Sequence, residues 1–187
     1  MKNLKQFCMI IQKRSEENDK SIKLLYKQKL YGNCISILRQ ELDSMVRVLF
    51  LLSQEQEIRQ CLIQQTLNNE KWKIGKKQIK DFELINNILN LHGWAKNVYM
   101  FGCSFIHLSM FHCYSEQDPF ENLSTEELKA IKNFMVQYHN FPQNNQINFI
   151  TMKPYILDIF DKISSNLQCS LQNLEKNPID TVKGHMV

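Results

Sequence analysis

The sequence contains little glycine or proline. Its 187 residues include five glycines and four prolines, and none of the glycines follows an asparagine or an aspartate. The Asn-Gly and Asp-Gly pairs that favour two-residue β-hairpins are therefore absent. Leucine, isoleucine, glutamine and lysine instead fill long stretches without a helix breaker, as is typical of helical proteins. We expect an all-α fold, a helical bundle of about seven helices without a sheet.

The chain also lacks a long uninterrupted apolar run. The longest apolar stretch, 98–111, is interrupted by Ser104, His107 and Ser109, and a membrane span needs about 20 apolar residues. The apolar stretch 7–11 near the N-terminus is too short for the core of a signal peptide. We therefore expect a soluble, cytoplasmic protein that does not act in a membrane.

The six cysteines form no Cys-x-x-Cys pair. Several lie in apolar helical segments, where a reduced thiol behaves as a small apolar side chain, and this usage fits a reducing compartment. His107, His112 and Cys113 do not have the spacing of a zinc motif. The chain also has no glycine-rich phosphate loop. We expect neither a metal nor a cofactor.

No Gly/Ser-rich or Pro-rich stretch separates two domains. We expect a single helical domain over 1–176 and a flexible tail over 177–187. A capping box beginning at Ser124 and a cap at Thr151 mark the starts of the last two helices, and 148–150 is expected to be briefly extended. Apolar periodicity predicts helices over 4–12, 22–30, 34–52, 54–67, 81–91, 96–114, 125–139 and 153–176.

The predicted helix 34–52 is apolar on nearly every side but carries three charges, on Arg39, Asp43 and Arg47. The spacing of four residues places these charges in one stripe, and a buried charge without a partner costs several kcal/mol. The stripe could bind an anionic group, because arginine matches the geometry of phosphate. Alternatively, it is an ion-pair ladder that satisfies itself within the bundle.

The predicted helix 96–114 carries His107, with Ser104 one turn earlier. A histidine there could act as a general base near neutral pH, and Ser104 could orient it or the substrate. The alternative is a core histidine bonded to a neighbouring hydroxyl or carbonyl group.

The most basic window, 70–80, contains Lys73, Lys76 and Lys77 close to Trp72. Lysines beside an aromatic residue are typical of nucleic-acid contacts, although a solvated loop has the same composition. The net charge of +4 permits an acidic partner such as RNA without requiring one.

Two of these segments resemble the HEPN-like helical proteins. The run 38–52, with its Arg-x-x-x-acidic pattern, and the later run 99–109, with Ser104, His107 and Ser109, are similar to an uncharacterised bacterial branch of that family. The resemblance covers about residues 20–115, a HEPN-like core to which helices over 124–176 would be added. It implies an all-α bundle, often a homodimer, of the kind found in toxin–antitoxin and phage-defence systems.

Several members of that family cleave RNA without a metal, using an arginine followed four to six residues later by a histidine. His107 matches the histidine of this motif, whereas the arginine position falls at 100–102, which contains none. Either Arg39 or Arg47 supplies the cation from the neighbouring helix, or the protein binds without cutting.

Two main functions remain open at this point. In the first, His107 is the base or acid of a metal-independent endoribonuclease, Arg39 and Arg47 stabilise the phosphorane and Asp43 orients them. In the second, the protein is a non-catalytic subunit or regulator that acts on a cognate protein partner. A pocket for a small phosphorylated ligand is a weaker third possibility.

Overall fold

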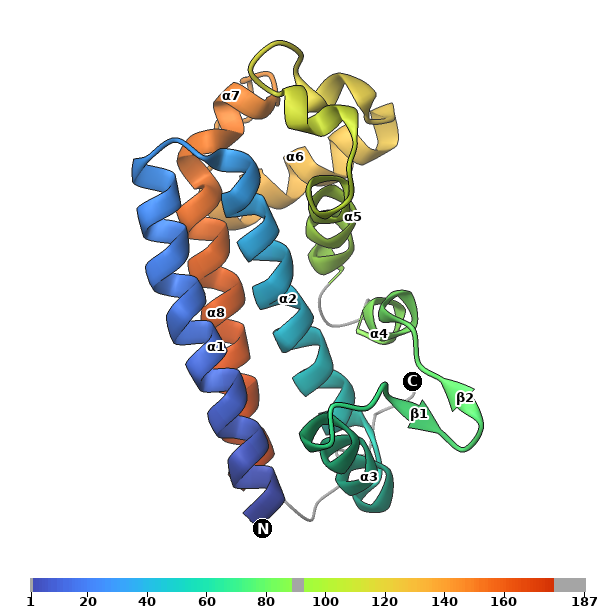
Figure 1. The fold of residues 1–187 in the computed structure, drawn as a ribbon. Coiled ribbons are helices and arrows are strands. Elements are labelled where there is room, and N and C mark those ends of the chain that lie inside the picture. The colour runs from blue at the N-terminus through green and yellow to red at the C-terminus, as the bar shows by residue number, and fades with distance from the viewer. Residues whose placement is uncertain (1, 89–92, 177–187) are drawn as a thin grey trace.

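The computed structural model describes residues 2–88 and 93–176, which form an all-α bundle with one small hairpin (Figure 1). The predicted fold class is confirmed. The α-helices are α1 (Lys2–Lys27), α2 (Tyr31–Ser53), α3 (Gln56–Leu67), α4 (Asp81–Asn87), α5 (Trp94–Ile106), α6 (Thr125–His139), α7 (Phe149–Met152) and α8 (Ile156–Lys176). Short 3₁₀ helices cover Met110–Cys113, Pro119–Asn122 and Lys153–Tyr155.

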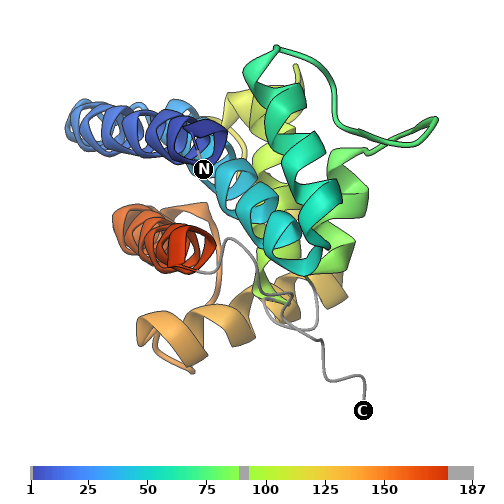
Figure 2. The same ribbon diagram turned by 90° about the horizontal axis from the view of Figure 1, so that it is seen from below.

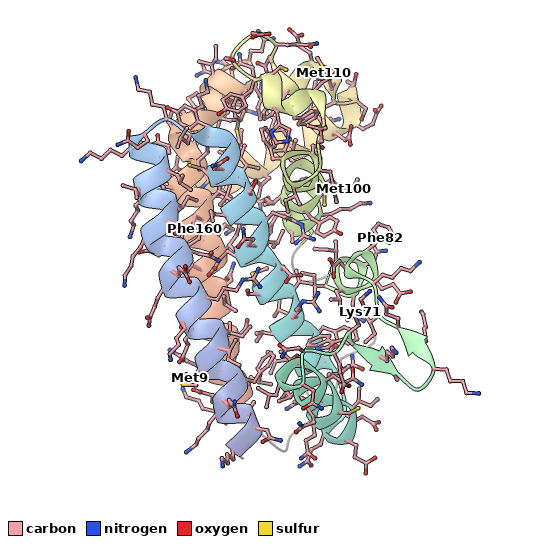
Figure 3. The ribbon with its side chains drawn as sticks, viewed as in Figure 1. Met9, Lys71, Phe82, Met100, Met110 and Phe160 are labelled. Carbon is pink, nitrogen blue, oxygen red and sulfur yellow. The ribbon has the colours of Figure 1, made fainter. Side chains whose placement is uncertain are left out.

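Helices α1, α2 and α8 lie side by side along most of their length (Figures 1 and 2). Helix α8 presents one continuous apolar face, and its Phe160 is buried among the three helices (Figure 3). The most extensive contacts of α2 are with α8, followed by those with α5 and α1. Helix α8 therefore closes the bundle core.

Helix α2 is central because apolar side chains surround it. Leu42, Met45, Val48 and Leu51 are each fully buried although they point in different directions around the helix axis. With α1 and α8 on one side and α4 and α5 on the other, α2 has two buried faces. Polar residues on either face consequently need partners from neighbouring helices.

One open question about the first part of the chain is answered, and two predicted boundaries there are wrong. The polar stretch 14–20 could either continue or bend the first helix, and it continues it, since α1 runs from Lys2 to Lys27. Helix α5 ends at Ile106 rather than at 114, because His107 is extended and Ser109 caps a separate 3₁₀ turn. Helix α4 ends at Asn87 instead of 91, and residues 89–92 lie outside the described residues.

The expectation of no strand is also corrected by β1 (Lys73–Ile74) and β2 (Lys77–Gln78), which pair antiparallel within the basic window. Gly75 supplies the positive φ of the turn. Figures 1 and 2 show this hairpin reaching away from the helices.

Near the C-terminal end, the Ser124 capping box is confirmed, and the predicted extended stretch 148–150 is wrong. Phe149–Met152 is instead the short helix α7, and Asn148 and Thr151 cap it reciprocally. Thr151 is thus not the cap of α8. The predicted tail 177–187 lies outside the described residues. None of the described helices is both long and apolar enough to cross a membrane.

Candidate functional site

A cleft with a volume of about 320 Å³ opens where α2, α4 and α5 meet, and α1 contributes to one wall. Three of the four arginines of the sequence lie in it, although lysine is much the commoner basic residue of the chain. The lining residues are Arg14, Arg39, Gln40, Asp43, Arg47, Asp81, Tyr99, Cys103, Ile106 and His107. We call this feature the arginine cleft.

Helix α2 supplies the floor of the cleft, because its stripe of Arg39, Asp43 and Arg47 faces α4 and α5. Helix α5 approaches this stripe closely at Gly102. A Cβ atom at that position would lie 2.9 Å from the Cβ of Arg39, so glycine is needed for the contact. Helix α5 then places Tyr99 and Cys103 along the same wall at helical spacing, and His107, the extended residue that follows α5, also lines the cleft.

Arg39 is the deepest cation, with a side chain only 7% exposed. Its Nη2 lies 3.7 Å from Asp81 and its Nη1 4.0 Å from Asp43, while the guanidinium carbon lies 3.9 Å from the centre of the Tyr99 ring. No hydrogen-bond partner of Nε is found among the described residues. Burial lowers the pKa of Arg39, but the nearby Cys103 thiol, Asp43 and Tyr99 together outweigh this effect. The net result is a raised pKa, so the guanidinium stays charged.

Arg47 makes the shortest ion pairs of the cleft. Its Nε donates to both carboxylate oxygens of Asp43 at 3.1 and 3.2 Å, and its Nη2 donates to Asp81 at 2.8 Å. Arg14 of α1 lies 3.6 Å from Asp43. Three guanidinium groups thus share two carboxylates, which leaves an excess of one positive charge. The side chains of Arg47 and Arg14 are 28% and 39% exposed, so this charge is open to solvent.

Tyr99 adds a neutral donor to the cleft. Partial burial raises the pKa of its phenol, and the adjacent Arg39 only partly offsets this effect. The hydroxyl group therefore keeps its proton at neutral pH.

His107 lies at the mouth of the arginine cleft, at the C-terminal end of α5. It is exposed, so it is not the core histidine of the alternative interpretation. Its backbone N–H donates to the carbonyl oxygen of Cys103 at 3.0 Å, and its own carbonyl lies 3.2 Å from Nε2 of His112. The structure therefore places His107, Arg39, Asp43 and Arg47 in the lining of one cleft.

Ser104 does not lie in the arginine cleft. It lines a separate hollow between α5 and α6, together with Met100 and Glu127. The backbone carbonyl of Ser104 accepts a hydrogen bond from the hydroxyl group of Ser109. The predicted role of Ser104 in orienting His107 or the substrate has no support from this placement.

The lysines of the basic window lie on the exposed hairpin, where Lys77 pairs with Glu83 at 2.9 Å. Lys73 and Lys76 are also exposed. Trp72, by contrast, is buried against Phe50, and its Nε1 donates to Thr66 at 2.7 Å. Its ring also lies beneath Arg47, 5.0 Å from the guanidinium carbon. Trp72 therefore anchors the hairpin next to the cleft and cannot stack on a nucleic-acid base.

Sequence reasoning missed Arg14, Asp81 and Tyr99. The sequence offered one signal for Arg14. Arginine is scarce in this lysine-rich chain, and three of the four arginines lie in the cleft. The fourth, Arg59, shows that the signal is not specific. Arg59 is buried and donates to the carbonyl oxygens of Leu51 and Gln54, so it caps the C-terminal end of α2.

Within residues 2–88 and 93–176, no group of three or more histidine, cysteine or acidic side chains could hold a metal ion. The cleft itself offers guanidinium, carboxylate, phenol, thiol and imidazole groups. These groups suit the binding of an anion and the transfer of a proton beside it.

Neither a family model, a curated protein nor a solved structure matches this chain.

Proposed function

We propose that this protein binds the phosphodiester backbone of RNA in the arginine cleft and cleaves it without a metal ion. The observation that supports the proposal is the placement of an exposed imidazole, His107, in the same cleft as three guanidinium groups. The excess positive charge favours a phosphate, and arginine forks match its oxygens.

In this proposal His107 takes the proton of a ribose 2′-hydroxyl group, and the 2′ oxygen attacks the adjacent phosphorus. The bond from phosphorus to the 5′ oxygen breaks, and water supplies the proton for that leaving oxygen. Arg47 and Arg39 stabilise the negative charge of the phosphorane, and Asp43 holds both guanidinium groups. The products are a 2′,3′-cyclic phosphate and a 5′-hydroxyl end.

The hairpin next to the cleft carries further exposed cations. Trp72, at the base of the hairpin, lies beneath Arg47, and Lys73, Lys76 and Lys77 of the hairpin are exposed. In the proposal these lysines contact flanking phosphates without reading the sequence.

A second function is favoured by the ion pairs themselves. Arg14, Arg39 and Arg47 each lie within 4.0 Å of a carboxylate, as they would in a seam that only fixes helix packing. The protein would then be a non-catalytic subunit that binds a cognate protein, for example in a toxin–antitoxin or phage-defence system. The homodimer implied by the family resemblance stays a prediction under both functions.

Incubation of the purified protein with a mixed RNA pool in EDTA tests the first function. We expect cleavage that survives EDTA and falls about a hundredfold or more in the His107→Ala and Arg47→Gln variants. His112→Gln is the matched control, because it removes an exposed imidazole outside the cleft and keeps a donor for the His107 carbonyl. Equal activity in all four proteins, or none in any, would favour the non-catalytic function.

A further inference from the structure

The two carboxylates of the arginine cleft are held differently. Asp43 lies on α2 between its two arginines, with a side chain 19% exposed, and it contacts Arg14, Arg39 and Arg47. Asp81 comes from another element, the first turn of α4, and its side chain is 46% exposed. Asp43 is thus built into the cleft, whereas Asp81 reaches the arginines from its edge.

Asp81 bridges the two guanidinium groups with its separate oxygens. Its Oδ1 lies 2.8 Å from Nη2 of Arg47, and its Oδ2 lies 3.7 Å from Nη2 of Arg39. A phosphate group bound by the same two arginines would make the same pair of contacts through two of its oxygens. The carboxylate therefore occupies the position that an incoming phosphate needs.

We propose that Asp81 is an internal competitor of the phosphate, which binds by displacing this carboxylate from Arg39 and Arg47. This inference rests on the proposed function, since it concerns the regulation of the same cleft. Displacement requires only a rotation of the Asp81 side chain, which is 46% exposed. Helix α4 stays in place, because the buried Leu84 and Ile85 anchor it. The adjacent Phe82 projects away from the bundle and does not hold Asp81 in the cleft (Figure 3).

The consequence is a threshold for binding. A single weakly held phosphate must compete with Asp81, whereas a polyanion that also contacts Arg14 and the hairpin lysines replaces the carboxylate with several contacts at once. The displacement costs both ligands the same, so a single phosphate is left weakly bound, whereas a nucleic-acid strand offsets the cost through its further contacts.

The test measures the affinity of Asp81→Asn for two ligands, inorganic phosphate and a 2′-O-methyl RNA oligomer that lacks the reacting 2′-hydroxyl. The amide keeps the size of the side chain and removes its charge. We expect both ligands to bind about tenfold more tightly. Glu83→Gln is the matched control, since it removes the same charge from the first turn of the same helix but leaves Arg39 and Arg47 paired, and the exposed ion pair that it breaks with Lys77 is worth little. We expect it to change affinity less than about twofold.

Equal affinities of Asp81→Asn and Glu83→Gln would overturn the inference, and so would weaker binding by Asp81→Asn in a protein that circular dichroism shows to be folded. Arg47→Gln distinguishes this failure from that of the proposed function. If Arg47→Gln weakens RNA binding but Asp81→Asn changes nothing, only the internal competition is refuted. If Arg47→Gln also leaves RNA binding unchanged, or no variant binds either ligand, both proposals are refuted.

Discussion

Helix α2 carries two polar clusters on opposite faces, and they differ in charge balance and in exposure. On the side of α1 and α8, Glu41 is completely buried and accepts hydrogen bonds from Ser15 and from Asn18, the latter at 2.8 Å. Ser164 of α8 lies 3.4 Å from Ser15. On the side of α4 and α5, charged groups of both signs surround an open cleft. We call the first feature the Glu41 cluster.

The Glu41 cluster is sealed, and no ion pair among the described residues includes Glu41. Neutral donors from α1 satisfy the carboxylate, so the cluster fixes how α1 and α2 pack and leaves nothing for a ligand to contact. The arginine cleft keeps exposed cations and an exposed imidazole. The comparison shows two uses of polar groups on α2. An enclosed group whose hydrogen bonds are satisfied supports the fold, whereas charged groups that remain exposed to solvent suit the binding of a ligand.

Glu41→Ala is expected to cause the largest loss of stability. It leaves the donors of Ser15 and Asn18 unpaired and creates a cavity between α1, α2 and α8, which should lower the free energy of unfolding by about 3 kcal/mol. Urea denaturation measures the loss. Glu41→Gln retains an acceptor and should lose about 1 kcal/mol. If both variants unfold like the unchanged protein, the Glu41 cluster does not hold the helices together.

Gly102→Ala should have a smaller effect, located at the other face of α2. The added methyl group would press against the Arg39 side chain and force α5 away from α2. Overpacking opposes the better helix propensity of alanine, and we expect a net loss of about 1 kcal/mol together with weaker RNA binding. Ser104→Ala on the same helix is the stability control and should change the free energy of unfolding by less than about 0.5 kcal/mol. A Gly102→Ala protein more stable than this control would contradict the close packing of α5 on Arg39.

The sequence predicted the parts of this comparison that lie within one helix. The apolar faces of α2 and the spacing of Arg39, Asp43 and Arg47 follow from helical periodicity, and both are found in the structure. The capping box at Ser124 is equally local, because its two hydrogen bonds join residues three positions apart.

The parts that depend on distant contacts were not predictable. Arg14 and Asp81 enter the cleft from α1 and α4, and no local pattern shows that they meet α2. Glu41 lies in the same helix as the arginine stripe, but its burial follows from the packing of α1 and α8. The end of α5 at Ile106 was missed for a similar reason, since apolar residues continue past it and no proline or glycine marks the boundary.

A paired affinity measurement tests the roles of the two faces of α2 separately. The 2′-O-methyl RNA oligomer is titrated into the unchanged protein, Arg47→Gln and Glu41→Gln, at a temperature at which all three are folded. If the arginine cleft binds RNA and the Glu41 cluster only supports the fold, Arg47→Gln binds about tenfold more weakly. Glu41→Gln then keeps its affinity within about twofold despite its lower stability. Unchanged affinity in Arg47→Gln, or an equal loss in both variants, would contradict this division of roles.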